Sequence, residues 1–269
     1  KLSKILMPMI PPHERYFEPF FGGGSMFFRK EKVSWNILND IDNDLVNLYI
    51  TVLEKFDLFS ECVYWMPRSR VLFDEYKQII LNEIVTDFPN VKRAARYYFI
   101  VRNAFNNIPK NPMSKDTYWN PSKMIEELKL SKEKLSGSTI ENMDFKELIA
   151  RYDSRPNDFF YFDPPYVVAE TAKNTHGDDY YRHIFNSSDH EKLRNLALYL
   201  DDTGSKFMIS YDNNEEIIDL YQGPTSGNNV FTINKISTKY AGRRKDPGKI
   251  FKELVITNYK PVQQMEMSL

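Results

Sequence analysis

The chain has 269 residues, 42% of them hydrophobic and 27% charged, and its 36 Lys and Arg nearly balance 37 Asp and Glu to leave a net charge of −1. This composition is typical of a globular protein and excludes disordered, collagen-like and heptad-fibre classes. The single cysteine, Cys62, excludes an internal disulfide and predicts a reducing compartment. No apolar stretch approaches the roughly 20 residues that span a bilayer, so we expect no membrane partner. Taken alone, the near-zero charge argues against a nucleic-acid partner.

The amino-terminal segment has the pattern that opens a doubly wound α/β domain. A predicted strand at 15–20 ends in a loop with three consecutive glycines, and a short helical stretch is expected from Ser25. A second strand at 34–39 ends at Asp40, and helical apolar spacing then covers 42–54. Strand, glycine turn, helix, strand, acid and helix in this order favour a Rossmann-like core.

The middle of the chain is predicted to be a helical insertion. Helical runs at 71–83 and 89–105 are followed by a polar stretch with three prolines at 106–122. Because no strand of convincing length occurs there, we expect a helical subdomain with a loop-rich tip. Within its second helical run, the aromatic residues 97–99 are expected to pack in the helix core.

Strands and helices alternate again after the insertion. Strands are expected at 138–143, 158–162, 205–209, 230–236 and 251–257, and helices at 145–152, 188–200 and 214–221. The α/β pattern therefore continues where the insertion interrupted it. We predict a first core part at 1–56, the insertion at 57–136 and a second core part at 137–269.

The most informative tetrapeptide, Asp163-Pro164-Pro165-Tyr166, directly follows a strongly apolar strand. A buried parallel strand delivers such an acid to the carboxyl edge of the sheet, where open α/β folds bind ligands. The two prolines fix φ and donate no N–H, so the loop is stiff and its carbonyls are free to accept. An acid beside a rigid carbonyl offers two acceptors for one planar amino group, and a Tyr ring can stack on a base. The structural alternative is a proline-rich turn.

The glycine loop and the acid after the next strand predict a nucleoside-bearing cofactor. The candidate residues are Glu18, Phe20, Gly22 and Gly23, because glycines let the backbone approach a ligand closely. The spacing is not G-x-G-x-x-G and no G-K-[ST] follows, so a pyrophosphate cradle is not indicated. Asp40 stands where an acid can accept both hydroxyls of a ribose.

These motifs, in this order, resemble the Dam-type DNA adenine-N6 methyltransferases of the D12 class. Residues 16–28 (YFEPFFGGGSMFF) are similar to the family's glycine-loop motif, and residues 37–49 are similar to its ribose-binding segment. Residues 142–145 end in the family's Asp-Phe pair, and D-P-P-Y is its catalytic motif. The resemblance implies a class I S-adenosylmethionine-dependent methyltransferase fold, Rossmann-like with a mixed seven-stranded sheet, and an inserted helical target-recognition subdomain.

The resemblance also implies S-adenosyl-L-methionine as the cofactor and assigns residues to it. Lys1 falls where the family has a lysine that meets the cofactor carboxylate. Asp40 corresponds to the residue that takes the ribose, and Asp144 and Phe145 to those beside the adenine. Asp163 would serve both the cofactor pocket and the target amine.

On the DNA side the match is partial. Arg102, Phe105 and Asn106 correspond to the family's R-x-N-F-N-G target-side motif, but Ala104 and Asn107 replace its first Asn and its Gly. This departure leaves the DNA target open, GATC included.

Positive charge gathers at 235–252, where seven basic residues face a single acid. The family places a basic loop that meets the DNA backbone at this point, so the residues expected to contact phosphate are Lys239, Arg243, Arg244 and Lys245. An ordinary solvated loop is the alternative. Lys92, Arg93 and Arg96 in the insertion either form a solvated face or add to the same positive potential.

No metal site is expected. His176, His183 and His190 recur every seven residues, which is not a standard ligand spacing, and we expect them at the surface or in loops. Cys62 lies among aromatic residues and is expected to be buried.

We therefore expect a cytoplasmic enzyme of a bacterial or phage-infected cell that methylates N6 of an adenine flipped out of double-stranded DNA. In a restriction–modification setting, a cognate restriction endonuclease acting on the same site would be its partner; phage and Dam-like settings are the others. Cytosine-N4 or RNA base methylation and a non-catalytic DNA-binding homologue stay open as alternatives. The acid of D-P-P-Y favours adenine, and its intact motif argues against loss of catalysis. Protein-glutamine methylation fits less well.

Overall fold

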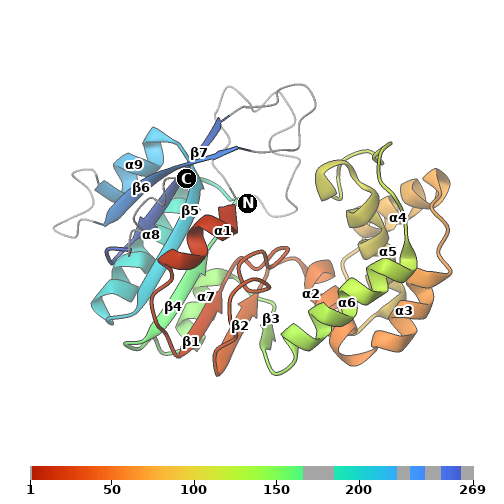
Figure 1. Cartoon of the computed structure of the whole chain (residues 1–269), viewed down its shortest axis with the longest axis horizontal. Coiled ribbons are helices and arrows are strands. Elements are labelled where there is room, and N and C mark those ends of the chain that lie inside the picture. The colour runs from red at the N-terminus through yellow and green to blue at the C-terminus, as the bar shows by residue number, and fades with distance from the viewer. Residues whose placement is uncertain (1, 166–184, 223–230, 240–249, 262–269) are drawn as a thin grey trace, which may run out of the picture. The chain divides into compact units, whose positions relative to one another are not determined.

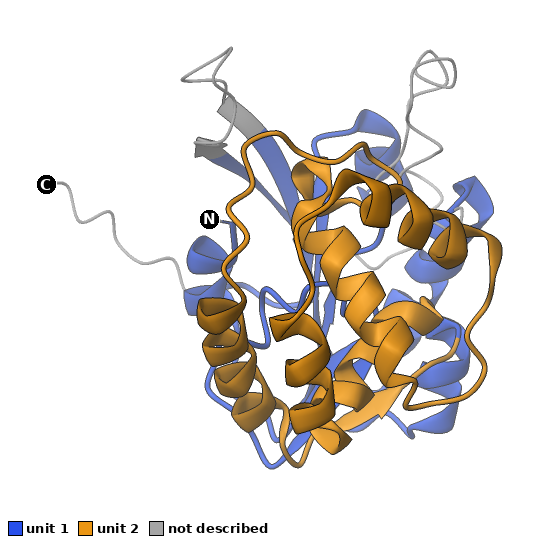
Figure 2. Ribbon diagram, turned by 90° about the vertical axis from the view of Figure 1, so that its right-hand side faces the viewer, with its two compact units in different colours: residues 1–39, 144–167, 185–269 blue, residues 40–143, 168–184 orange. Residues whose placement is uncertain are grey.

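The computed structural model describes residues 2–165, 185–222, 231–239 and 250–261. They fall into two compact units (Figure 2). Unit 1 comprises 2–39, 144–165 and the described residues from Phe185 onward, and unit 2 comprises 40–143. The segment 57–136, predicted as the insertion, lies within unit 2.

The strands form one mixed seven-stranded sheet in the order β3-β2-β1-β4-β5-β7-β6 (Figure 1). Their bounds are Arg15–Glu18 (β1), Trp35–Asn39 (β2), Thr139–Glu141 (β3), Asp158–Phe162 (β4), Lys206–Asp212 (β5), Thr232–Lys239 (β6) and Ile250–Thr257 (β7). Pairing is parallel from β2 through β1 and β4 to β5, and antiparallel between β5 and β7 and between β7 and β6. The predicted Rossmann-like, mixed seven-stranded fold is confirmed.

Two short helices of unit 1 precede β1, and the other three lie along the chain between strands. They are α1 (Leu2–Leu6), the 3-10 helix η1 (Met7–Met9), α7 (Phe145–Arg151), α8 (Ser187–Asp202) and α9 (Glu215–Gln222). Helix α8 begins with a capping box, in which the Asn186 side chain and the Asp189 side chain satisfy each other's backbone N–H groups. The short helix expected from Ser25 is wrong, because the chain there makes only turns. Its i→i+4 bonds, such as Phe28 N to Gly24 O (2.9 Å), are too few to propagate a helix.

Unit 2 is helical apart from β3, as expected for the insertion. Its elements are α2 (Asn43–Glu54), α3 (Phe56–Tyr64), α4 (Arg70–Asn82), α5 (Val91–Asn103), the 3-10 helix η2 (Phe105–Asn107) and α6 (Pro121–Leu135). Helix α5 supplies Tyr97, Tyr98 and Phe99 to the buried core, so the expectation for these aromatics is confirmed. Cys62 is exposed, and its predicted burial is wrong.

Arg93 on α5 is buried, not part of a solvated or DNA-facing surface. Its Nε and Nη2 donate to both carboxylate oxygens of the fully buried Asp44 on α2, at 2.6 and 3.1 Å. Its Nη2 also donates to the main-chain oxygen of Glu83 at 2.6 Å. A buried guanidinium requires such a bidentate partner, so this charge is neutralised within unit 2.

Aromatic side chains build the core of unit 1. All five residues of β4 are buried, because a central parallel strand is covered on both faces. Phe160 on β4 stacks on Phe17 of β1 with ring centroids 4.3 Å apart. Arg15 and Asp158, which are register partners at the starts of these strands, form a bidentate pair at 2.7 and 2.6 Å. These contacts fix β4 beside β1. They therefore also fix the position of Asp163 and Pro164, which directly follow β4.

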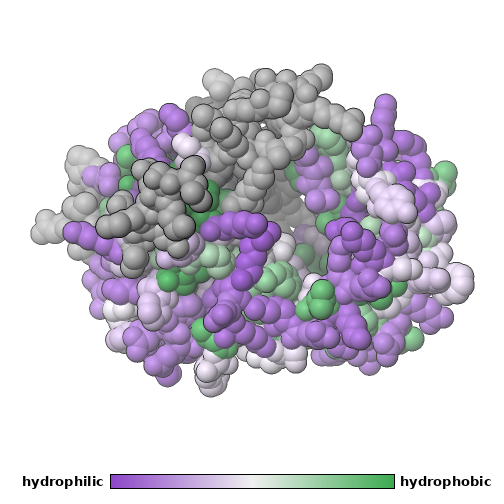
Figure 3. All heavy atoms as spheres, in the orientation of Figure 1, coloured by the Kyte–Doolittle hydropathy of each residue, from purple (hydrophilic) through white to green (hydrophobic). Residues whose placement is uncertain are grey.

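In the space-filling view most of the visible described surface is hydrophilic, with hydrophobic residues scattered singly (Figure 3). Within the described residues, no helix is both long and apolar enough to span a bilayer.

Candidate active site

Asp163 and Pro164 directly follow β4 at its carboxyl end, as predicted. Asp163 is half-buried and Pro164 is buried. Burial raises the pKa of the Asp163 carboxyl to about 6, against the opposing effect of a hydrogen bond from Ser210. A carboxylate with this pKa is ionised at neutral pH and can accept hydrogen bonds from an amine. Tyr166, the last residue of the motif, lies outside the described residues.

Ser210 on β5 is a partner of Asp163 that the sequence analysis missed. Its Oγ donates to Asp163 Oδ1 at 3.0 Å and lies 3.0 Å from the hydroxyl of Tyr161 on β4. Ser210 is fully buried and Tyr161 nearly so. The available signal was a small hydroxyl residue in the buried middle of β5, between Ile209 and Tyr211.

Glu18, at the end of β1, is a second buried carboxyl near Asp163. Burial, helped by the charge of Asp163, raises the pKa of Glu18 to about 8. The hydroxyl of Tyr16 donates to Glu18 Oε2 at 2.7 Å and opposes the rise. Lys30, also buried, lies over the Tyr16 ring at 4.4 Å. Glu18 is therefore largely protonated at neutral pH, which leaves Asp163 as the ionised carboxyl of the pair.

Three phenylalanines pack around Phe20, and one of them, Phe162, directly precedes Asp163 in the chain. Phe20, which follows β1, lies 5.2 Å from Phe145, 6.3 Å from Phe162 and 5.6 Å from Phe185, measured between ring centroids. The cluster unites two predicted cofactor residues, Phe20 and Phe145, with the last residue of β4. Such edge-to-face and tilted rings are suited to hold a planar aromatic ligand.

The glycine loop leaves open space where side chains would otherwise stand. Gly22 has φ +47° and Gly23 an ordinary φ, and among the described residues a Cβ added at either would meet no atom within 4 Å. At Gly24, with φ +61°, a Cβ would lie 2.7 Å from the rings of Phe21 and Phe28. Gly24 is thus required for packing, whereas Gly22 and Gly23 border a space that a ligand can fill.

The two other acids predicted for the cofactor have local structural partners. Asp144 caps α7, its Oδ1 accepting from Lys146 N at 2.9 Å. Asp40 follows the carboxyl end of β2 but belongs to unit 2, where its Oδ1 accepts from Asp42 N at 2.9 Å. Their contact with a cofactor stays a prediction. Lys1 lies outside the described residues.

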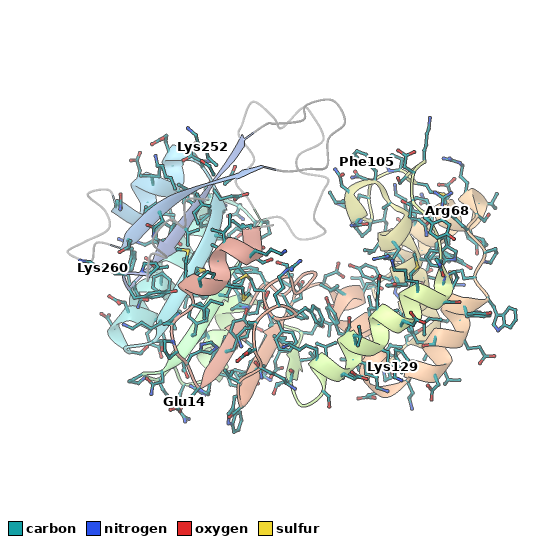
Figure 4. The ribbon with its side chains drawn as sticks, viewed as in Figure 1. Glu14, Arg68, Phe105, Lys129, Lys252 and Lys260 are labelled. Atoms are coloured by element: carbon teal, nitrogen blue, oxygen red, sulfur yellow. The ribbon has the colours of Figure 1, made fainter. Side chains whose placement is uncertain are left out.

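In unit 2, the loop after α5 presents the predicted target-side residues. Phe105 is 55% exposed (Figure 4), and Asn106 is exposed with φ 57°. Arg102 on α5 forms a long ion pair of 3.8 Å with Glu127. The loop is held at its base, where Ser114 N donates to Asn103 O at 2.7 Å. Arg68 also braces it through a bond of 2.6 Å from Nη2 to Ser114 O.

Of the predicted basic loop, the structure describes only the flanks. The main chain of Lys239 ends β6, but its side chain and the residues Arg243, Arg244 and Lys245 lie outside the described residues. Lys252 on β7 is exposed (Figure 4), and so is Lys235 on β6. Their register partners are Leu254 and Ser237, which puts both lysines on one hairpin.

His190 is buried in α8, so the surface or loop placement expected for it is wrong. Its Nδ1 lies 2.9 Å from the hydroxyl of Tyr211, and burial lowers its pKa to about 4. The described residues contain no group of three His, Cys, Asp or Glu arranged to hold a metal ion.

Comparison with known families decides which enzymes this site belongs to. The family described as "D12 class N6 adenine-specific DNA methyltransferase" matches residues 1–241. The chain belongs to this D12 class. Its activity is therefore the methylation of adenine in DNA, and its family implies a methyl donor of the S-adenosylmethionine type.

Named relatives of this D12 enzyme agree with the assignment. "Type II methyltransferase M1.LlaDCHI" of Lactococcus lactis is 28% identical, over 95% of this chain and 89% of the relative. "Type II methyltransferase M.MjaIII" of Methanocaldococcus jannaschii is 28% identical, over 91% and 89%. "DNA adenine methylase" of Serratia marcescens is 26% identical, over 79% and 80%.

Proposed function

We propose that this D12 enzyme is a Dam-type methyltransferase that acts on N6 of an adenine flipped out of double-stranded DNA, with Asp163-Pro164-Pro165-Tyr166 as its catalytic motif. The observation that carries the proposal is the ionised, half-buried Asp163 at the carboxyl end of β4, beside the phenylalanine cluster. An amino group inside a duplex is out of reach of such a site, so the base must leave the stack.

Asp163 and the Pro164 carbonyl activate the target nitrogen. The lone pair of an adenine amino group is delocalised into the ring, which makes the nitrogen a weak nucleophile. If the two N–H bonds are accepted by the Asp163 carboxylate and the Pro164 oxygen, the nitrogen becomes pyramidal and its lone pair localises. Fixed acceptors of this kind contribute through positioning and preorganised dipoles. Tyr166 would stack on the extruded base.

The described residues fit S-adenosylmethionine, which supplies an electrophilic methyl group when bound. The space at Gly22 and Gly23 suits close backbone approach, and the cluster around Phe20 and Phe145 suits its adenine. Glu18, Asp40, Asp144 and Lys1 complete the proposed cofactor set.

Replacing Gly23 with alanine tests the glycine loop as part of the cofactor site. Its φ is ordinary and the added methyl meets no atom of the described part of the chain within 4 Å, so the fold should tolerate it. We expect the melting temperature to change by less than about 2 °C. We expect the Kd for S-adenosylmethionine, measured by calorimetry, to rise about tenfold because the methyl occupies ligand space. An unchanged Kd would exclude Gly23 from the pocket.

We assign target recognition to the insertion 57–136, through Arg102, Phe105 and Asn106. Phosphate contacts are assigned to the basic hairpin loop with Lys239, Arg243, Arg244 and Lys245, supported by the exposed Lys235 and Lys252 on its flanks. The names of two relatives, both type II methyltransferases, support a restriction–modification setting, in which the proposed partner is a restriction endonuclease of the same target. The location that we propose for the enzyme is cytoplasmic.

The decisive experiment is to express the full chain in a bacterial host that lacks its own DNA methyltransferases and to map modified bases by single-molecule sequencing. We expect N6-methyladenine at one recurring sequence. Methylation of cytosine N4 instead would overturn the base assignment. An unmodified genome, with purified protein that still binds S-adenosylmethionine, would favour the non-catalytic homologue.

A further inference from the structure

We propose that Ser210 and Tyr161 are positioning residues that hold the Asp163 carboxylate through a relay of two hydrogen bonds. The inference rests on the proposed role of Asp163 and extends it to two side chains on neighbouring strands. Tyr161 lies on β4 two residues before Asp163, and Ser210 lies on β5, which pairs in parallel with β4. All three belong to unit 1.

The direction of the relay follows from counting hydrogens. A serine hydroxyl has one hydrogen to donate and accepts through its lone pairs, and so does a tyrosine hydroxyl. Ser210 Oγ lies 3.0 Å from Asp163 Oδ1 and 3.4 Å from Phe162 O, and the charged, closer carboxylate is the stronger acceptor. With the Ser210 hydrogen committed to Asp163, Tyr161 must donate to Ser210 Oγ across their 3.0 Å contact.

The two hydrogen bonds of the relay satisfy buried hydroxyls and also orient the Asp163 carboxylate. A polar group that is buried costs free energy unless it is hydrogen-bonded, and both hydroxyls lie in the buried interior of the sheet. Because Ser210 binds Oδ1, the carboxylate is fixed in rotation and Oδ2 is the oxygen that we assign to the target amine. A carboxyl without this partner would rotate freely and would hold its proton more tightly.

The titration of Asp163 can be followed separately from that of its neighbours, because they titrate at higher pH. From β1, Glu18 and Tyr16 lie close enough to interact electrostatically with it, and Lys30 adds a positive charge to that pair. The pKa of Glu18 is raised to about 8 and that of Tyr16 is raised well above its ordinary value. Both therefore stay mostly neutral between pH 5 and 7, where Asp163 loses its proton.

The test compares the full-length wild type with Ser210→Ala, Ser210→Thr and Tyr161→Phe. One measurement is the rate of single-turnover methylation of unmethylated bacterial genomic DNA from pH 5 to 9. The other is the carboxyl titration of Asp163, followed by 13C NMR in protein labelled at aspartate and assigned by its loss in Asp163→Asn. The matched control is Ser205→Ala, since Ser205 is equally buried just before β5 but donates to Arg155 O at 2.9 Å instead.

For Ser210→Ala we expect the acidic limb of the rate profile and the NMR midpoint to move up together by about one pH unit. The midpoint moves to higher pH because the lost hydrogen bond had stabilised the charged carboxylate. The rate should fall about fivefold at pH 6 and less at pH 8. Tyr161→Phe should shift both in the same direction by less, and Ser210→Thr should restore the wild-type profile.

An Asp163 titration that is unchanged in Ser210→Ala and Tyr161→Phe would overturn the relay, as would an equal shift in Ser205→Ala. If Ser210→Ala does not fold, Tyr161→Phe, which removes one oxygen, decides in the same way. The NMR titration needs no turnover. An inactive wild type would therefore refute the proposed function and still leave the relay to be judged.

Discussion

Replacing Asp163 with alanine is expected to abolish methylation and to leave the protein folded. The variant loses the acceptor that the proposed mechanism places on the target amine, and we expect a rate at least about a thousandfold below wild type. Tritiated methyl transfer to unmethylated genomic DNA measures this loss. The matched control is Asp153→Ala, an exposed aspartate of unit 1, which should retain the wild-type rate.

The fold should survive because the Asp163 carboxylate is itself a cost to stability. Its pKa is raised from 3.8 to about 6, so the folded protein holds the proton more tightly than the unfolded chain. Stability from this group therefore falls as the pH rises from about 4 to 6, and the full cost is present at pH 7. We expect the Asp163→Ala melting temperature at pH 7 to match or exceed that of the wild type. Substantial methylation by a folded Asp163→Ala protein would refute the assignment.

Replacing Arg93 with alanine is expected to destabilise unit 2 more than any surface change. The substitution leaves the fully buried Asp44 carboxylate without its bidentate partner and removes the donor to Glu83 O. Breaking such a buried pair costs about 3–5 kcal/mol. Urea unfolding monitored by tryptophan fluorescence measures the cost, since Trp119 packs on Phe99 of the same core.

The control for this prediction is Arg102→Ala on the same helix. Arg102 is 40% exposed and its 3.8 Å pair with Glu127 is open to solvent, so its loss should cost less than about 1 kcal/mol. Equal effects of the two substitutions would show that the Arg93–Asp44 pair contributes nothing specific. Replacing both Arg93 and Asp44 with apolar residues should recover much of the loss, because no unpaired charge then stays buried.

Elements with strong local signals could be predicted closely. Helix α5 and strand β4 were expected at 89–105 and 158–162 and are observed at Val91–Asn103 and Asp158–Phe162. Periodicity and an unbroken apolar run are properties of the residues within each element. The stretch after Ser25 shows where such signals mislead. A helix was expected there, but the chain makes turns, and the rings of Phe21 and Phe28 pack tightly at Gly24.

Burial of single polar residues was the part that could not be predicted. Arg93 and His190 were expected to be exposed, yet the first binds Asp44 and the second contacts Tyr211. Each partner lies far along the chain, 49 residues away for Arg93 and 21 for His190. A charged residue in a helical run has the same local pattern whether or not a buried acid meets it.

The sequence by itself determined the order of the strands and helices, the acid at the end of β4 and the glycine loop after β1. Prolines, glycines and apolar runs act on their own neighbourhood, so they can be interpreted without the fold. Only the tertiary structure decided which side chains hold Asp163. Ser210 lies 47 residues beyond it, and the pairing of β4 with β5 brings them to 3.0 Å. The pKa of Asp163 depends on that burial and that bond, and neither is a local property of the chain.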